Sequence, residues 1–74
     1  MIEITRYTRD DGVVMNKLPS GNWVIKLSEV GDYYDKNRPI NDCWALNSAY
    51  NYDLEKLSMT FDDAYAKLII VPAP

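Results

Sequence analysis

The residues of this chain best suited to catalysis are two adjacent carboxylate pairs, Asp10-Asp11 and Asp62-Asp63. Paired carboxylates can act as general acid and general base. Each pair also has a structural explanation, because Asp10-Asp11-Gly12 is typical of a turn and Asp62-Asp63 suits the start of a helix. The chain contains no histidine, which removes the commonest general base at neutral pH and the commonest metal ligand. We therefore expect no enzymatic activity and no catalytic residues.

Metal and cofactor sites are not indicated either. The single cysteine, Cys43, cannot build a zinc cage, and we interpret it as a small buried hydrophobic residue. Asp32, Asp35 and Asp42 could supply oxygen ligands, but their spacing does not match a calcium-binding loop. The three glycines lie too far apart to cradle a phosphate group. We predict no metal site and no cofactor.

Tyrosine is unusually frequent, with six in 74 residues, and four of the six lie in an acidic part of the chain. Residues 28–63 carry eight acidic and three basic side chains, a net charge of −5, within an overall net charge of −3. Tyrosine offers rigid contact area with a polar tip, and carboxylates around it suit a basic protein surface. Alternatively, two or more of these rings only complete a small core. The predicted partner-binding residues are Asp32, Tyr33, Tyr34, Asp35, Asp42, Tyr50, Tyr52 and Asp53.

These features favour stoichiometric binding to a larger protein or nucleoprotein complex with a basic site. A small acidic chain with an initial methionine and no linker is typical of free-standing reading frames of phages and mobile elements. Such proteins often inhibit host enzymes or defence complexes, such as CRISPR effectors. We therefore expect an inhibitor that occupies a lysine- and arginine-lined site which normally holds nucleic acid.

Two alternatives stay open: a small nucleic-acid-binding module, and a structural or assembly subunit that forms a homo-oligomer through an edge strand. The nucleic-acid alternative needs a tyrosine as a stacking platform beside cations on one sheet face. The negative net charge argues against general polyanion binding and against membrane-surface binding. The residues predicted for this alternative face are Tyr7, Arg9, Met15, Lys17, Val24 and Lys26.

A β-hairpin over Val13–Leu27 positions most of these side chains. Two apolar-rich runs flank Pro-Ser-Gly-Asn at residues 19–22, which is typical of a hairpin loop. Pairing Leu18 with Trp23 across this four-residue loop gathers one apolar face. The members of that face are Val14, Leu18, Trp23, Ile25 and Leu27.

A strand at residues 2–9 precedes this hairpin, and two loop lengths compete at Asp10-Asp11-Gly12. A three-residue loop, with its glycine in the left-handed conformation, pairs Thr8 with Val14. Because a slip of one residue turns every side chain to the other face, only this loop places Ile4 on the predicted apolar face. We therefore predict the three-residue loop and a three-stranded meander.

The middle of the chain is rich in turn residues. We predict a short edge strand at Tyr33-Tyr34 and a single helical turn after Asp53. The run Cys43-Trp44-Ala45-Leu46 is either a fourth strand or the start of a helix capped by Asn41, and we favour the strand.

The C-terminal third carries a helical pattern. Thr60 is a good N-cap, and Asp63 imitates a capping box with a shorter acid. A helix from about Phe61 to Ile69 would then end before Pro72. We expect its stripe to pack on the Trp23 face; the stripe consists of Phe61, Ala64, Tyr65 and Leu68.

The expected fold is therefore α+β: a three- or four-stranded antiparallel sheet, beginning with a β-meander, packed against one C-terminal helix. Residues 1–74 form one small domain, with a frayed tail at 72–74. A single cysteine favours a reducing, cytoplasmic location. No apolar run approaches the roughly 20 residues of a membrane span, so we expect no membrane partner.

Overall fold

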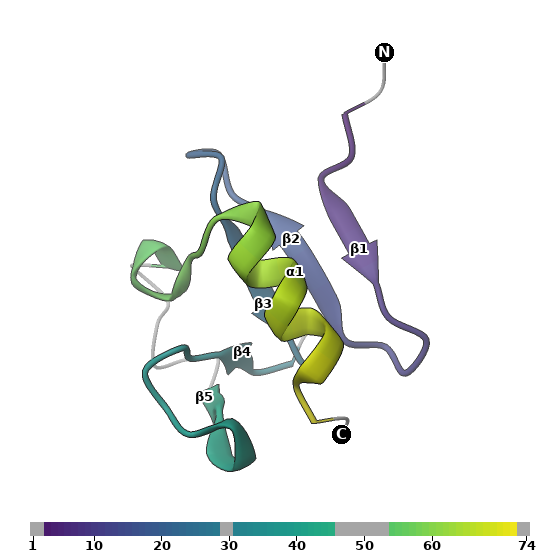
Figure 1. Cartoon of the computed structure of the whole chain (residues 1–74). Coiled ribbons are helices and arrows are strands. Elements are labelled where there is room, and N and C mark those ends of the chain that lie inside the picture. Colours follow the sequence, from purple (N-terminus) through teal and green to yellow (C-terminus); the bar gives the residue numbers. More distant parts are fainter. Residues whose placement is uncertain (1–2, 29–30, 46–53, 73–74) are drawn as a thin grey trace.

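An antiparallel sheet covered on one face by a helix forms the architecture, as expected (Figure 1). The computed structural model describes residues 3–28, 31–45 and 54–72. Its sheet has five strands rather than three or four, in the order β1-β2-β3-β4-β5. The elements are β1 (Arg6–Thr8), β2 (Val14–Lys17), β3 (Trp23–Lys26), β4 (Tyr33–Tyr34), η1 (Ile40–Asp42), β5 (Trp44–Ala45), η3 (Leu54–Leu57) and α1 (Phe61–Ile70).

The loop between β1 and β2 confirms the predicted three-residue connection. Thr8 pairs with Val14, and the Arg9 N–H donates to the Val13 carbonyl at 2.7 Å. Gly12 adopts a φ of 96°, a conformation that favours glycine. The predicted loop length is therefore confirmed, although the reason given for it, the placement of Ile4 on the Trp23 face, is not.

The loop between β2 and β3 differs from the prediction by one residue. Lys17, not Leu18, pairs with Trp23, and the Leu18 N–H donates to the Asn22 carbonyl at 2.7 Å. The loop is therefore the three residues 19–21, with Gly21 at a φ of 98°. Its glycine occupies the same last position as in the first hairpin, and this repeat explains why the four-residue loop is wrong.

This slip exchanges the predicted faces of the sheet. Trp23 and Ile25 share the helix-covered face with Val13, Met15 and Tyr7. Leu18 and Val24 instead pack with Tyr33 and Leu57 in a separate cluster, and strand alternation places Val14 on this second face as well. Ile4 is 58 % exposed, so the prediction that it packs on the Trp23 face is wrong.

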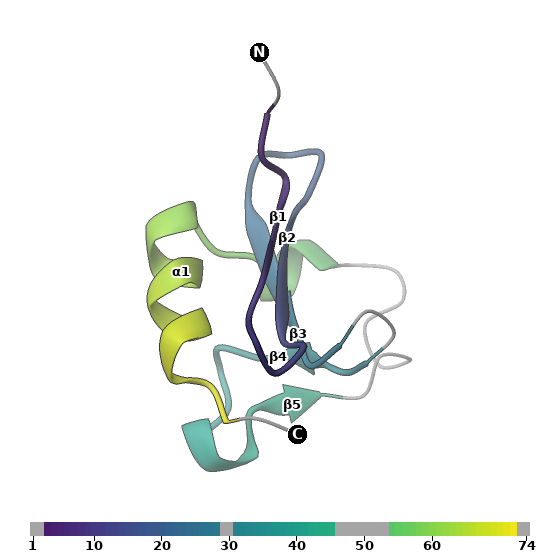
Figure 2. The ribbon, with the colours of Figure 1, turned by 90° about the vertical axis from the view of Figure 1, so that its right-hand side faces the viewer.

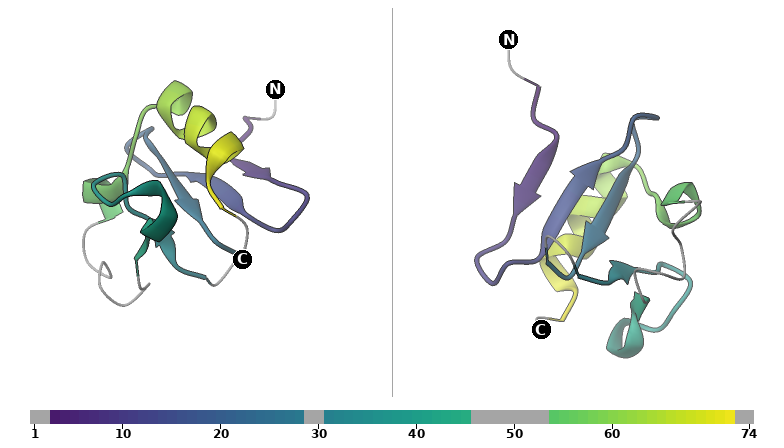
Figure 3. Two further views of the ribbon diagram at one scale, coloured as in Figure 1. Left: turned by 60° about the horizontal axis from the view of Figure 1, so that its bottom comes forward. Right: turned by 180° about the vertical axis from the view of Figure 1, so that it is seen from behind.

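Helix α1 confirms the predicted boundaries to within one residue. The Thr60 hydroxyl accepts a hydrogen bond from the Asp63 N–H, and Val71 adopts an extended conformation just before Pro72. The buried residues of the helix are Ala64 and Leu68, which pack in the hydrophobic core. The helix lies across β2 and β3, as Figures 1 and 3 show.

The middle of the chain completes the sheet. Tyr33–Tyr34 is a strand, as predicted, but it lies between β3 and β5 rather than at an edge. Trp44–Ala45 is the predicted additional strand, and Leu54–Leu57 is the predicted single helical turn, here a 3-10 helix. Leu46 and residues 73–74 of the predicted tail lie outside the described residues. Within the part of the chain that the structure describes, no helix is long and apolar enough to cross a membrane.

Candidate functional site

Three of the eight residues predicted to contact a partner are buried inside the protein. Tyr33, Tyr34 and Asp35 are only 9, 3 and 6 % exposed, so they are not available as contact residues in this structure. The Tyr34 ring meets the Trp44 ring edge-on at 6.3 Å, and burial raises the pKa of the Tyr34 hydroxyl. Asp35 Oδ1 accepts a hydrogen bond from the Asn37 N–H at 2.9 Å, which closes a local turn.

The remaining residues of that prediction divide into two groups. Asp42 is exposed, and its Oδ2 lies 3.7 Å from Nη2 of Arg38. Asp32 is half-buried. Both aspartates therefore stay predicted partner contacts. The other three residues fall outside the described part of the chain and stay untested; they are Tyr50, Tyr52 and Asp53.

The alternative binding face is not a single face, because the sheet register divides it. Met15 and Val24 are buried on opposite sides of the sheet. Lys26 also lies on the second face, where its Nζ sits 5.4 Å from the centre of the Tyr33 ring. Lys17 forms an ion pair with Glu3. The predicted cations therefore do not converge on Tyr7.

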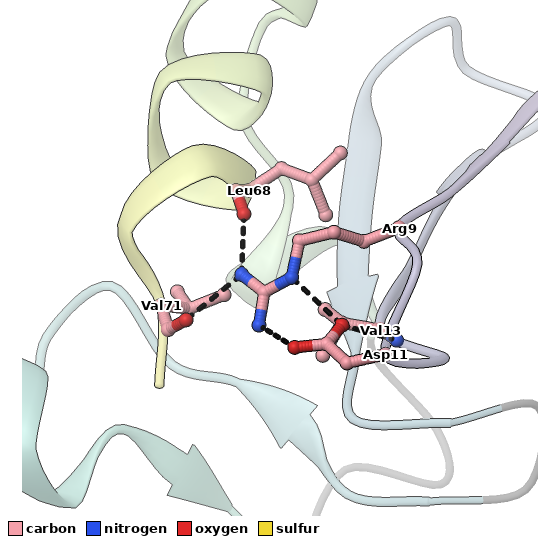
Figure 4. Close-up of polar contacts among 5 residues, drawn as sticks. All are labelled: Arg9, Asp11, Val13, Leu68 and Val71. Atoms are coloured by element: carbon pink, nitrogen blue, oxygen red, sulfur yellow. Dashed lines mark hydrogen bonds and ion pairs between the residues drawn. The ribbon is translucent and has the colours of Figure 1, made fainter. Parts of the chain in front are cut away.

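Arg9 belongs to a structural clamp rather than to a cationic surface (Figure 4). Its Nη1 donates to the carbonyls of Leu68 and Val71 at 2.7 and 2.8 Å. Its Nε and Nη2 donate to the two carboxylate oxygens of Asp11 at 2.8 and 2.6 Å. The guanidinium thus satisfies carbonyls at the end of α1 and ties them to the β1–β2 loop.

This clamp was missed from the sequence. Its only local signal is an arginine two residues before an aspartate. The hydrogen bond from Arg9 holds the pKa of the Asp11 carboxyl below its ordinary value. The partner carbonyls lie 59 and 62 residues away in the chain, so only the fold identifies them.

The most distinctive surface is an aromatic cluster between β1 and α1. The Tyr7 ring lies 5.7 Å from Trp23, 5.6 Å from Phe61 and 6.2 Å from Tyr65. Trp23 is buried beneath the helix, whereas Phe61 and Tyr65 are 39 and 44 % exposed. The cluster therefore has a buried base and an accessible outer side.

The accessible side continues along α1. Ile69 is 64 % exposed and follows Phe61 and Tyr65 at the four-residue spacing that lines one side of a helix. We call Tyr7, Phe61, Tyr65 and Ile69 the α1 patch. A cavity of about 200 Å³ opens beside it, between the strand and the helix. The lining residues of the cavity are Tyr7, Thr8, Arg9, Tyr65, Leu68 and Ile69.

A larger hollow of about 590 Å³ lies on the other side of α1 and is more polar. It includes side chains of both charge signs, among them Lys36, Lys67 and Asp63. Lys36 is already used there, because its Nζ donates to the Ser58 carbonyl at 2.8 Å. Because its lining carries both positive and negative side chains, the hollow does not indicate a ligand of either charge.

The single cysteine and the potential metal ligands form no reactive site in the described residues. Cys43 is buried, and burial raises the pKa of its thiol, so it packs as a hydrophobic residue. In the described residues, no three side chains of histidine, cysteine, aspartate or glutamate come together as potential metal ligands. Comparison of the chain with protein-family models, with characterised proteins and with solved structures finds no match.

Proposed function

We propose that this chain is a protein-binding module that docks through the α1 patch. The observation that carries the proposal is the run of exposed aromatic and aliphatic side chains along one side of α1, at Phe61, Tyr65 and Ile69. Scattered exposed apolar residues need no explanation, but a contiguous group marks an interaction surface. Removing such side chains from water favours association, and the part of this gain that exceeds the entropy cost of binding appears as affinity.

The patch is also held in shape before any partner arrives. Phe61 and Tyr65 stack at 5.8 Å, and Trp23 supports Phe61 from below at 5.3 Å. The Arg9 clamp fixes the end of α1 against the β1–β2 loop. A preorganised aromatic surface loses little conformational freedom on binding, which favours affinity.

Charges around the patch suit a partner with basic groups. Asp62 is exposed beside Phe61, where it would form part of a polar rim, whereas Asp63 lines the hollow on the other side of α1. An inhibitor of a host nucleic-acid-processing or defence complex would be one protein of this kind. Its main contact would then be the α1 patch, with Asp32 and Asp42 as outlying charges.

Photo-crosslinking tests this proposal. A photoreactive residue at position 69 should capture a defined partner in extracts of the native cells, and Ile69→Lys in the purified protein should compete poorly for that partner. Ile40→Lys is the matched control, because Ile40 is also exposed, at 44 %, but lies in η1 outside the patch. Equal competition by both variants would refute docking through the α1 patch.

A further inference from the structure

Helix α1 carries a second apolar stripe outside its contact with the sheet. Its buried residues pack toward β2 and β3. Ile69 and Ile70 are nevertheless 64 and 57 % exposed. Figure 2 shows the sheet on one side of α1 and no other element of the described chain on the opposite side. We call the exposed apolar residues of this part of the helix the outer stripe; they are Tyr65, Ala66, Ile69 and Ile70.

The outer stripe has the spacing with which helices pack on helices. Tyr65, Ala66 and Ile69 follow Asp62 after three, four and seven residues, so all four lie along one side of α1. Ala66, in the middle, has a small side chain, which lets a second helix come close. The rows of side chains on that helix would then fit the grooves of this surface.

Backbone chemistry favours a helix over an extended segment as the occupant. The outer stripe consists of helix side chains, and the backbone groups beneath them are bonded within α1. An extended segment laid over the stripe would turn some of its N–H and C=O groups away from water without giving them partners, which is costly. A helix satisfies these groups internally, so only its side chains have to fit the surface.

Asp62 selects the charge of the occupant. It forms no ion pair within the described residues, and a helix that covers the outer stripe would remove its carboxylate from water. A carboxylate in such a place needs a cation beside it. Lysine and arginine suit the last turn of a helix, where the dipole is negative. An antiparallel helix brings that last turn to Asp62, at the N-terminal end of α1.

We propose that the outer stripe docks an amphipathic helix of a different protein, antiparallel to α1, with a lysine or arginine of its last turn beside Asp62. Apolar side chains of that helix cover Tyr65, Ile69 and Ile70. A second copy of this chain does not fit, because antiparallel pairing centred on Ala66 would set Asp62 against the apolar Ile70 of the other copy. This inference rests on the proposed function and names the chemistry of its partner.

A helical peptide tests this chemistry on the intact protein. The probe has about 14 residues, or four turns. One face carries leucines at three- and four-residue spacing and an arginine in the last turn, and a hydrocarbon staple on the opposite face keeps it helical. An NMR titration of the isotope-labelled protein should show binding, with the shifts concentrated on the amides of α1. Ile69→Lys should weaken binding about tenfold or more, whereas Ile40→Lys, outside the stripe, should have little effect.

Moving the arginine tests both charge and direction. A second stapled peptide of the same composition carries the arginine in its first turn and should bind about threefold to fivefold more weakly, as expected for the loss of a surface ion pair. Asp62→Asn should remove this difference between the two peptides. Asp42→Asn is the matched control, because Asp42 is also exposed but lies in η1, and it should preserve the difference. Circular dichroism checks that both variants fold.

The outcomes separate this inference from the proposed function. No binding of the stapled peptide, or a difference between the two peptides that survives Asp62→Asn, would overturn it. Equal binding by an unstapled version with a central proline would overturn it in favour of an extended occupant. Self-association of the wild-type chain that Ile69→Lys abolishes would overturn it in favour of a second copy. If Ile69→Lys abolishes capture of the partner while the peptide does not bind, docking through the α1 patch stands and helix docking fails.

Discussion

Two groups of aromatic side chains differ in how far the fold buries them. Tyr34 and Trp44 belong to β4 and β5, and the Tyr34 ring is buried among neighbouring elements. Phe61 and Tyr65 instead lie on the side of α1 that faces Tyr7 of the edge strand β1, and part of each ring stays exposed. The difference comes from position in the sheet, because an interior strand such as β4 is enclosed on more sides than an edge strand. Local richness in tyrosine therefore does not by itself identify a binding surface.

Replacing one tyrosine of each group with alanine should give the largest difference in the free energy of unfolding. Tyr34→Ala should lower the free energy of unfolding by about 3–5 kcal/mol, as for other buried aromatic residues, and would unfold much of so small a protein. Tyr65→Ala should lower it by only about 1 kcal/mol, because its ring is nearly half exposed. Urea denaturation followed by circular dichroism measures both values. Equal losses would contradict the assignment of one ring to the core and the other to the surface.

The clamp that supports the α1 patch should have the next largest effect. Arg9→Met keeps much of the apolar stem but removes the hydrogen bonds to Leu68 and Val71, and should lower the free energy of unfolding by about 1–2 kcal/mol. Hydrogen exchange should rise mainly in the last turn of α1. Lys17→Met removes an ion pair to Glu3 at the surface and serves as the control, with a change of about 0–1 kcal/mol. A similar loss in both variants would mean that Arg9 acts only as a surface charge.

The clamp also predicts a dependence of stability on pH. The pKa of Asp11 is lowered in the folded protein by its hydrogen bond from Arg9. Its contribution to stability should therefore be complete above the ordinary carboxyl pKa of about 4, and should be lost as the pH falls through the lower folded value. Denaturation between about pH 5 and about pH 2 should show a smaller decline for Asp11→Asn than for the wild type. Identical declines in the two proteins would show that the interaction of Asp11 with Arg9 does not contribute to stability.

The smallest expected effect concerns the acidic segment. Asp32→Asn with Asp42→Asn should leave the unfolding free energy nearly unchanged, because the pair of Arg38 and Asp42 lies at the surface. If these aspartates are outlying contacts, the double variant should bind the captured partner several-fold more slowly at low salt, and added salt should remove the difference. Asp35 is left unchanged because it closes a buried turn. If the double variant lost more affinity for the partner than Ile69→Lys does, the acidic segment and not the α1 patch would be the main contact.

Much of the secondary structure could be predicted from short patterns. The glycine of the first loop, the Thr60 cap and the proline after the helix determine local backbone geometry, and all three predictions are confirmed. The predicted register of the second hairpin is wrong because the prediction placed Asn22 in the loop, whereas Asn22 pairs with Leu18. That error of one residue was enough to assign Ile4 and Tyr7 to the wrong faces.

The amino-acid sequence by itself determined an α+β arrangement with an antiparallel meander and one capped C-terminal helix, because loops, caps and breakers act over a few residues. Only the tertiary structure decided that Arg9 donates hydrogen bonds to carbonyls at the end of α1. It also decided that Tyr33 and Tyr34 are buried, whereas Phe61, Tyr65 and Ile69 are exposed along one side of the helix. These features join residues far apart in the chain. Their exposure depends on which strand is an edge and where the helix lies across the sheet, and no local pattern carries that information.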